Sequence, residues 1–157
     1  MNIFVLDLNP VGAAQMQCDK HVVKMILESA QLLCGVHWMT GREAPYKLTH
    51  KNHPCSKWAR ESLSNYDWLA QHACELCNEY TRRYGRVHKS QETIVWCYDN
   101  LPDIHNNGLT EFYLAMPDDC KIKGDPVQSY RKYYKKYKNH IAKWNHSEKP
   151  EWYEKEK

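Results

Sequence analysis

Three helix starts are marked in the chain by a proline, and two of these prolines directly follow a residue that can cap a helix, Asn9 and Asp125. With the residue before each proline, the pairs are Asn9-Pro10, His53-Pro54 and Asp125-Pro126. Proline suits the first helical position, because the N–H that it lacks would have no partner within the helix and its fixed φ angle is already helical. The pairs predict a first helix from Asn9 to about residue 34, a second from His53 to about residue 84, and a last from Asp125 to about residue 144.

The ends of these helices are predicted by glycine and by the spacing of apolar residues. The first helix is expected to stop at Gly35 and the second near Gly85, since glycine favours the position just after a helix. Ser90, with Glu92 in the first turn, predicts a third and shorter helix to about residue 98. Residues 99–124 are rich in loop-forming residues, and a short helical turn is expected near residues 109–115.

The fold class that follows is all-α: a compact single-domain helical bundle with long loops. The chain has 157 residues, which is enough for one domain (1–157) with a real core. Residues 1–8 form an apolar N-terminal segment, either a short strand or an extended stretch threaded into the core, and periodicity does not decide between them. Residues 145–157 form a polar C-terminal tail apart from Trp152 and Tyr153.

Cysteine usage and hydropathy bear on the compartment. The seven cysteines are an odd number, and the first apolar run contains Asp7 and is too short for the core of a signal peptide. Free thiols in a reducing cytosol are therefore expected. No segment approaches the roughly 20 apolar residues that span a membrane.

One polar stripe on the first predicted helix is the candidate wall of an active site. Gln17, His21, Lys24, Glu28 and Gln31 are spaced so that they share one helix face. A solvated face would show the same spacing. A titratable histidine one turn from a lysine and two turns from a glutamate is instead typical of a group of residues that perform acid–base chemistry.

The residues before the second predicted helix form a second polar cluster. It covers residues 49–55 with His50, Asn52 and His53, and Arg60 follows within the helix. A zinc site needs four ligands at typical spacings, and no matching second half is evident. An anion or phosphate site at a helix N-terminus fits better, and a capped loop with solvated histidines is the plain alternative.

Basic residues are concentrated at two further places. Lys89 lies just before the third predicted helix, where helix amides and a lysine suit a backbone phosphate. From residue 121 to residue 143 many lysines and arginines, interleaved with aromatic residues, stand against a single acid, Asp125. This helix either neutralises nucleic-acid phosphates while its aromatic stripe packs inward or is simply solvated. The net charge of +3 is too mild to decide.

Three stretches together resemble the pyrimidine-dimer DNA glycosylases of the phage endonuclease V type. Asp19-Lys20-His21, with Glu28 seven residues after the histidine, fits the family's Asp-x-His…Glu helix. The stretch from residue 46 to Gly85 is similar in pattern, and Lys149-Pro150-Glu151-Trp152-Tyr153 fits the family's basic-Pro-x-Trp-Tyr. Order and length agree over most of the chain.

The resemblance implies an all-helical repair enzyme in which the N-terminal α-amine attacks C1′ of the damaged nucleotide. The base then leaves, a Schiff base forms, and β-elimination nicks the strand. Such an amine keeps a useful neutral fraction near pH 7. Here it would belong to Met1, Glu28 would stabilise the cationic sugar and help to move protons, and His21 would orient the sugar or a phosphate. Trp152 and Tyr153 would contact the lesion strand.

The sequence thus predicts a DNA N-glycosylase that acts on a flipped, damaged or modified pyrimidine nucleotide, with an AP-lyase step implied by the resemblance. The expected catalytic residues are Glu28, His21 and Met1. The expected substrate- and phosphate-binding residues are Asp19, Lys24, His50, Asn52, His53, Arg60, Lys89, Trp152 and Tyr153.

DNA is the expected partner of a monomer in the cytoplasm of a bacterial or phage-infected cell, with no membrane, metal or cofactor. Two alternatives stay open at this point. One is a non-catalytic accessory protein that binds nucleic acid, which salt-sensitive binding without cleavage would reveal. The other is a metal-dependent nuclease that uses the histidine-rich loop, which sensitivity to EDTA would reveal.

Overall fold

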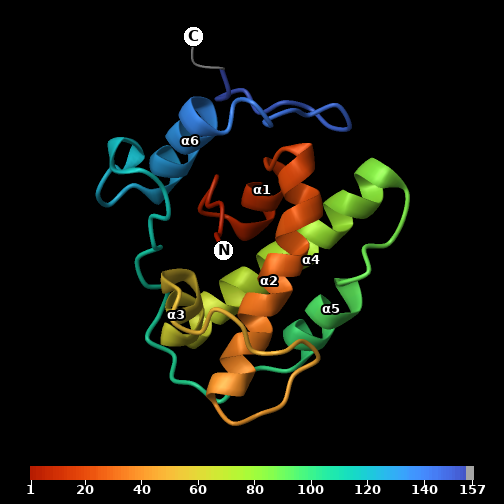
Figure 1. Cartoon of the computed structure of the whole chain (residues 1–157), viewed down its shortest axis with the longest axis vertical. Coiled ribbons are helices and arrows are strands. Elements are labelled where there is room, and N and C mark those ends of the chain that lie inside the picture. The colour runs from red at the N-terminus through yellow and green to blue at the C-terminus, as the bar shows by residue number, and fades with distance from the viewer. Residues whose placement is uncertain (155–157) are drawn as a thin grey trace.

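In the computed structural model, which describes residues 1–154, the chain is built from helices and connecting loops (Figure 1). The elements are α1 (Pro10–Gln15), α2 (Asp19–Met39), α3 (Pro54–Glu61), α4 (Leu63–Tyr84), α5 (Gln91–Asp99), the 3-10 turn η1 (Asp118–Cys120) and α6 (Pro126–Tyr137). No strand occurs within the described residues. The predicted all-α fold class is therefore confirmed.

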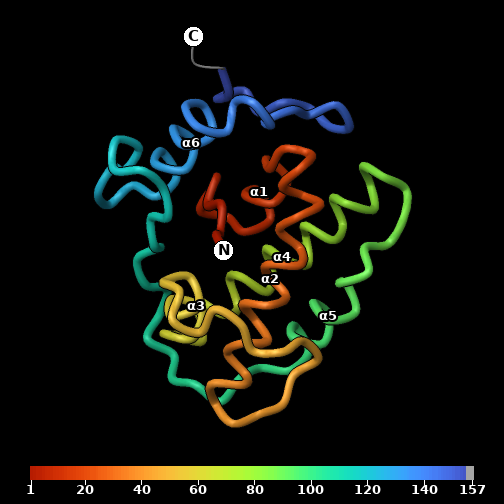
Figure 2. The backbone as a smooth tube through the Cα atoms, viewed as in Figure 1, coloured from red at the N-terminus to blue at the C-terminus, as the bar shows by residue number. Residues whose placement is uncertain are grey.

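The two longest helices, α2 and α4, pack against each other and form the centre of the bundle. Helix α1 packs on α4, while α3 and α5 each pack on both long helices. Helix α6 lies apart from this group, and the N-terminal segment lies between them (Figure 2). Within that segment, the ring of Phe4 is 4.1 Å from the ring of His21 on α2 and 5.6 Å from that of Tyr134 on α6, measured between centroids.

The N-terminal segment is threaded into the core without regular secondary structure. Ile3, Phe4, Val5 and Leu6 are all buried. Of the two forms expected from the sequence, a strand or a threaded stretch, the structure shows the second. The segment therefore brings Met1 to the side of α2 that faces α6.

All three predicted helix starts are confirmed. The side chains of Asn9, His53 and Asp125 each accept a hydrogen bond from a backbone N–H in the first turn of the helix that follows. The predicted end near Gly85 is confirmed as well, because Gly85 has a φ of 69°, in the left-handed region that favours glycine. The third predicted helix is α5, whose last residue lies next to the expected end.

The first predicted helix is interrupted, which corrects two expectations. Residues 16–18 separate α1 from α2, since the carbonyls of Gln15 and Gln17 accept from the Arg83 guanidinium at 2.9 and 2.8 Å. Helix α2 then continues through Gly35 rather than stopping there. Gly35 is buried, and its packing outweighs the cost of about 1 kcal/mol that glycine carries within a helix.

Long-range side-chain hydrogen bonds also explain two further differences between the predicted and the observed helices. Ser62 is extended and divides the second predicted helix into α3 and α4, and its hydroxyl accepts from the N–H of Asn107 at 2.9 Å. The helical turn predicted near residues 109–115 is wrong, because the N–H of Thr110 donates to Asn65 Oδ1 at 2.9 Å and the stretch follows α4 as a loop.

The last helix is shorter than expected. It ends at Tyr137 rather than near residue 144. Beyond it the carbonyl of Lys143 accepts from the N–H of Asp19 at 2.9 Å, so the chain turns toward the start of α2. The tail thus packs on the first half of the molecule instead of extending the helix.

The thiols and the hydropathy of the helices can be compared with two further expectations. Free thiols are found at Cys18, Cys34, Cys55, Cys74, Cys77 and Cys97. Across residues 1–154, no helix has both the length and the apolar character that crossing a membrane requires.

Candidate active site

A cavity of about 210 Å³ opens where the N-terminal segment, α2 and the end of α6 meet. It is small and mostly polar, and two lysines stand at its edge. The lining residues are Met1, Asn2, Phe4, His21, Lys24, Met25, Glu28, Tyr133 and Lys138. All three residues that the sequence predicted to be catalytic therefore lie around one cavity.

The α-amine of Met1 and the carboxylate of Glu28 are in direct contact. The amine nitrogen lies 3.3 Å from Glu28 Oε1, and Lys24 Nζ lies 3.9 Å from Oε2. The Glu28 side chain is 14% exposed, whereas that of Lys24 is 73% exposed. A half-sheltered carboxylate next to an amine can accept a proton from it, which is what an amine nucleophile requires.

Two contacts fix the start of the chain in this place. The Met1 side chain is only 3% exposed, so it anchors the residue whose amine meets Glu28. The Asn2 side chain donates to the carbonyl of Ala115 at 3.0 Å and accepts from the N–H of Ile3 at 2.8 Å. The amine is thus held by the residue that bears it and by the next one.

His21 lines the cavity as an uncharged ring. It is buried, stacks on Phe4 at an interplanar angle of 20°, and has its Nδ1 atom 2.7 Å from the hydroxyl of Tyr134. Burial lowers the pKa of His21 to about 3, with smaller contributions from Lys138 and Lys24. Near neutral pH this histidine therefore acts as a hydrogen-bonding group and not as a cation.

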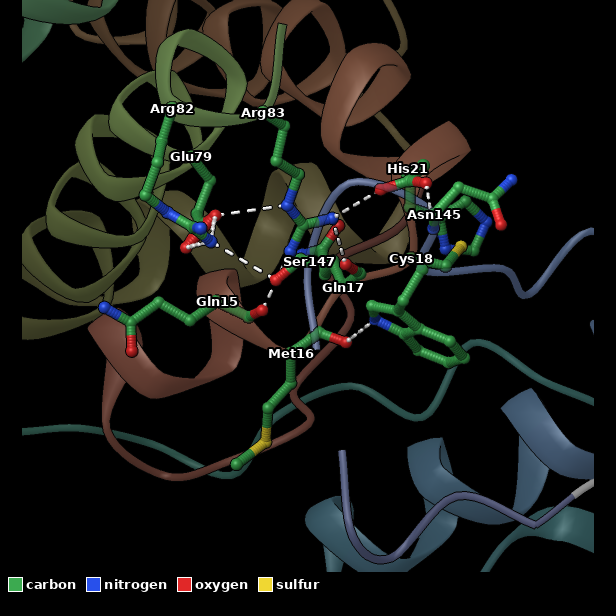
Figure 3. A network of polar contacts seen from close by, with 12 residues as sticks. Gln15, Met16, Gln17, Cys18, His21, Glu79, Arg82, Arg83, Asn145 and Ser147 are labelled. Atoms are coloured by element: carbon green, nitrogen blue, oxygen red, sulfur yellow. Dashed lines mark hydrogen bonds and ion pairs between the residues drawn. The ribbon is translucent and has the colours of Figure 1, made fainter. Parts of the chain in front are cut away.

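Asp19 belongs to a different cluster, centred on Arg83. Figure 3 shows Arg83 in this cluster together with Glu79 and Asn145. Asp19 Oδ1 accepts from Arg83 at 3.2 Å and its Oδ2 accepts from the N–H of Asn145 at 2.7 Å. Arg83 also donates to Glu79 at 3.1 Å. Asp19 therefore fixes the start of α2, half a turn before His21, and does not line the cavity among the described residues.

The predicted stripe is only partly one surface. His21, Lys24 and Glu28 do share a face of α2 and line the cavity. Gln17 precedes α2, is completely buried, and has its Nε2 atom 3.0 Å from the ring of His72. Three members of the stripe therefore line one cavity, whereas its first member belongs to the core.

The histidine-rich loop borders the cavity without lining it. His50 is exposed, with a left-handed φ of 52°, and Asn52 is exposed as well. His53 caps α3, and burial lowers its pKa, an effect that the charge of the Met1 amine increases and that of Glu28 opposes. The Arg60 guanidinium donates to the carbonyl of Lys51 at 2.7 Å, which fixes the loop on α3.

The other predicted binding residues lie further away. Lys89 is exposed in a shallow hollow before α5, and the neighbouring His88 ring contacts the Val23 carbonyl of α2 at 3.1 Å. Trp152 lies under the Arg131 guanidinium, 5.1 Å from its ring centroid, and Tyr153 is 5% exposed. These two aromatic residues pack near α6 and are absent from the described lining of the cavity.

Sequence reasoning did not identify five of the lining residues, which are Asn2, Phe4, Met25, Tyr133 and Lys138. The basic and aromatic pattern of residues 121–143 marked α6 as a surface that could face nucleic acid, but spacing alone does not show which face meets α2. Within residues 1–154, histidine, cysteine, aspartate and glutamate do not gather in groups of three or more that could hold a metal ion.

Comparison with known proteins identifies a family that part of the chain matches. The model of a family described as pyrimidine dimer DNA glycosylase matches residues 1–93, which include the N-terminal segment, α2 and the histidine-rich loop. No curated protein matches the chain, and no solved structure does.

Proposed function

Since the chain belongs to the pyrimidine dimer DNA glycosylase family, we propose that it breaks the glycosidic bond of one base of a pyrimidine dimer in DNA. This cleavage, base release, frees the base from its sugar while the cyclobutane ring still joins it to the neighbouring base. We further propose that the Met1 amine is the nucleophile, with Glu28 as its partner, and that strand cleavage follows as an AP-lyase step. The observation that carries this proposal is the 3.3 Å contact between the Met1 amine and the Glu28 carboxylate inside a polar cavity.

The proposed reaction begins with the amine in its unprotonated form. Its lone pair forms a bond to C1′ of the sugar, while the bond from C1′ to the base breaks and the electron pair leaves with the base, which takes up a proton. The nitrogen then loses its two protons, the C1′–O4′ bond breaks, O4′ takes up one proton to become a hydroxyl, and C1′ and the nitrogen are left as an imine. Removal of a C2′ proton then expels the 3′-phosphate by β-elimination.

Glu28 has two tasks in this scheme. Its carboxylate accepts the proton of the attacking amine, and its negative charge stabilises the cationic sugar that develops as the base departs. The partial burial of the Glu28 side chain supports both tasks, because charges interact more strongly away from bulk water. Lys24 lies at the exposed side of the carboxylate, where it suits a backbone phosphate.

The remaining predicted residues take binding and supporting roles in the proposal. His21, as a neutral ring, hydrogen bonds to a sugar or phosphate oxygen. In the proposal, His50, Asn52, His53 and Arg60 beside the cavity and Lys89 further away before α5 contact the backbone of the bound DNA. Trp152 meets the flanking strand with its exposed edge, Tyr153 supports it from the core, and Asp19 holds the start of α2.

A borohydride experiment tests the nucleophile directly. The protein is incubated with a duplex that carries one cyclobutane thymine dimer, and borohydride is added to reduce any imine to a stable adduct. We expect base release and a covalent adduct whose mass and fragments place the DNA on the Met1 nitrogen. An adduct on the Asn2 nitrogen after loss of Met1, or on a lysine, would overturn the assignment of the nucleophile.

A matched control is the same chain with one glycine placed before Met1. This extension moves the terminal amine by about 3.8 Å and converts the Met1 nitrogen into an amide, while every side chain stays in place. The extended protein is expected to bind the dimer duplex and to form no adduct. Salt-sensitive DNA binding without base release by the unextended protein would instead indicate a non-catalytic binding protein.

A further inference from the structure

Helix α6 lies outside the matched residues 1–93, yet two of its tyrosines contact members of the candidate site. Tyr130 and Tyr134 are one helical turn apart and are both completely buried. The Tyr134 hydroxyl lies 2.7 Å from His21 Nδ1, and the Tyr130 hydroxyl lies 3.0 Å from Asn2 Oδ1. One buried face of α6 therefore reaches both sides of the cavity, α2 and the N-terminal segment.

The bonds of Tyr134 determine which nitrogen of His21 carries the hydrogen. The Tyr134 hydroxyl accepts from the N–H of Cys18 at 3.2 Å, so its own hydrogen is available to His21 Nδ1. Burial raises the pKa of Tyr134 well above its ordinary value, so the hydrogen stays on the hydroxyl. Among the described residues the nearest acceptor for this hydrogen is His21 Nδ1, which favours the tautomer of the uncharged His21 in which Nδ1 accepts and Nε2 carries the ring hydrogen.

The bonds of Tyr130 hold the residue next to the amine. Its hydroxyl accepts from the N–H of Ala115 at 3.2 Å and shares its hydrogen between Asn2 Oδ1 and the carbonyl of Tyr113, which is 2.7 Å away. The Asn2 amide nitrogen donates to the carbonyl of Ala115. Both ends of the Asn2 amide are therefore bound to one patch, directly beside Met1.

We propose that Tyr130 and Tyr134 are positioning residues for the reaction at the N-terminal amine. Tyr134 presents the Nε2–H of His21 to the substrate, and Tyr130, through Asn2, holds the Met1 amine against Glu28. Neither tyrosine occurs among the described residues that line the cavity, so both act through the residues that they bind. The inference rests on the proposed function and adds to it a part of the chain that the family match does not cover.

The tautomer of His21 can be measured without any substitution. In protein labelled with ¹⁵N on histidine, the His21 ring is expected to show a hydrogen on Nε2 and an acceptor-type shift at Nδ1 near pH 7. In Tyr134→Phe the same ring is expected to lose this fixed tautomer. A hydrogen on Nδ1 in the unsubstituted protein would overturn the role of Tyr134, whatever the variant does.

Steady-state kinetics with the dimer duplex test both tyrosines. We expect kcat for base release to fall about 10- to 100-fold in Tyr134→Phe and in Tyr130→Phe, with KM changed little, because misplaced groups slow the step without removing a substrate contact. Tyr137→Phe is the matched control on the same helix: its hydroxyl binds Asp119 on the surface, and its kcat is expected to be unchanged.

Coupling distinguishes positioning from general support of the fold. Asn2→Ala is expected to lower the rate of borohydride trapping as Tyr130→Phe does, and the double variant to be no slower than either single variant. Rates are compared per folded molecule, measured by circular dichroism. Unsubstituted kcat and trapping rates in the folded tyrosine variants would overturn the inference, as would simple addition of the two single effects.

Failure of this inference is distinct from failure of the proposed function. If the unsubstituted protein releases no base and forms no adduct, the proposed function is wrong, and the tautomer of His21 still decides whether Tyr134 sets its hydrogen. If the unsubstituted protein is active and the variants are equally active, only the positioning role is wrong.

Discussion

Two charged clusters lie along helix α2, one around Arg83 at its start and one around Glu28 further along. They differ in how many of their polar groups have close hydrogen-bond partners. At the start of the helix, Arg83 is completely buried and donates to the Gln15 and Gln17 carbonyls and to the carboxylates of Asp19 and Glu79. Two turns further on, Glu28 has contacts of 3.3 and 3.9 Å and keeps part of its surface exposed.

The difference separates a structural role from a chemical one. Each of the three guanidinium nitrogens of Arg83 donates a hydrogen bond and the side chain is buried, so this cluster is closed to a ligand, and its loss would leave the buried Asp19 carboxylate without its cationic partner. Glu28 has long contacts to an amine and to an exposed lysine, which a substrate can displace. Both clusters bring acidic and basic groups into contact. They differ in that the contacts of Arg83 are buried and mostly short, whereas those of Glu28 are long and partly exposed.

The largest expected effect comes from breaking the Arg83 cluster. Arg83→Met is expected to lower the free energy of unfolding by about 3–5 kcal/mol, because Asp19 loses its buried cationic partner. Urea unfolding followed by circular dichroism measures it. Base release per folded molecule should be nearly retained, so a variant that is as stable as the unsubstituted protein, or folded but inactive, would contradict the division of roles.

The same test on the Glu28 cluster should give the opposite pattern. Glu28→Gln is expected to lower the rate of base release about 10²- to 10³-fold, to keep DNA binding, and to change the free energy of unfolding by no more than about 0.5 kcal/mol. Glu43→Gln, at an exposed loop position, is the matched control and should be as active as the unsubstituted chain. Full base release by Glu28→Gln would contradict the assigned site.

Acid should destabilise the fold through two buried histidines. One is His21, which lines the cavity, and the other is His72, which bonds to Gln17. Burial lowers the pKa of His21 to about 3 and that of His72 to about 4. Below the ordinary histidine pKa of about 6.5 the unfolded chain binds protons that the folded chain refuses, so stability falls as the pH drops from about 6.5 toward those values.

Each of these two histidines is expected to remove about 2 kcal/mol from the free energy of unfolding between pH 7 and pH 5. His21→Gln should therefore reduce the pH dependence of the urea midpoint, and His50→Gln, at an exposed position, should not. A free energy of unfolding that stays constant between pH 7 and pH 5 would contradict this, because it would mean that these rings take up protons as readily in the folded chain as in the unfolded chain.

The smallest expected effect concerns the exposed partner of Glu28. Lys24→Met should change the free energy of unfolding by no more than about 0.5 kcal/mol, as for other exposed pairs. If Lys24 binds one phosphate, the slope of log affinity against log salt should decrease by about 0.9. Lys47→Met, at an exposed loop position absent from the described lining of the cavity, should leave that slope unchanged.

Local signals in the sequence predicted local features of the fold. Capping side chains and prolines gave the starts of α1, α3 and α6, and Gly85 gave the end of α4, because each acts within one turn of its own position. The breaks were not predictable in this way. Residues 16–18 are held by Arg83, which is more than 60 residues away.

The same distinction applies to the candidate site. Helical spacing placed His21, Lys24 and Glu28 on one face, and the structure brings them to one cavity. Spacing gave no means to separate Gln17 from that face, since its burial depends on His72 across the bundle. It also gave no sign that α6 would close the cavity, because contacts between α6 and the N-terminal segment depend on the whole topology.

The threaded N-terminal segment has a consequence for the order in which the molecule is assembled. Asn2 bonds to Ala115 and Tyr130, partners 113 and 128 residues away along the chain. Contacts of such separation form late in folding, because long loops must close first. During synthesis, which proceeds from the N-terminus, the residue that carries the amine must wait for the ribosome to deliver α6. A nascent chain that still lacks α6 therefore has no assembled cavity. Activity at this site is expected only after α6 has been synthesised and has packed against the N-terminal segment.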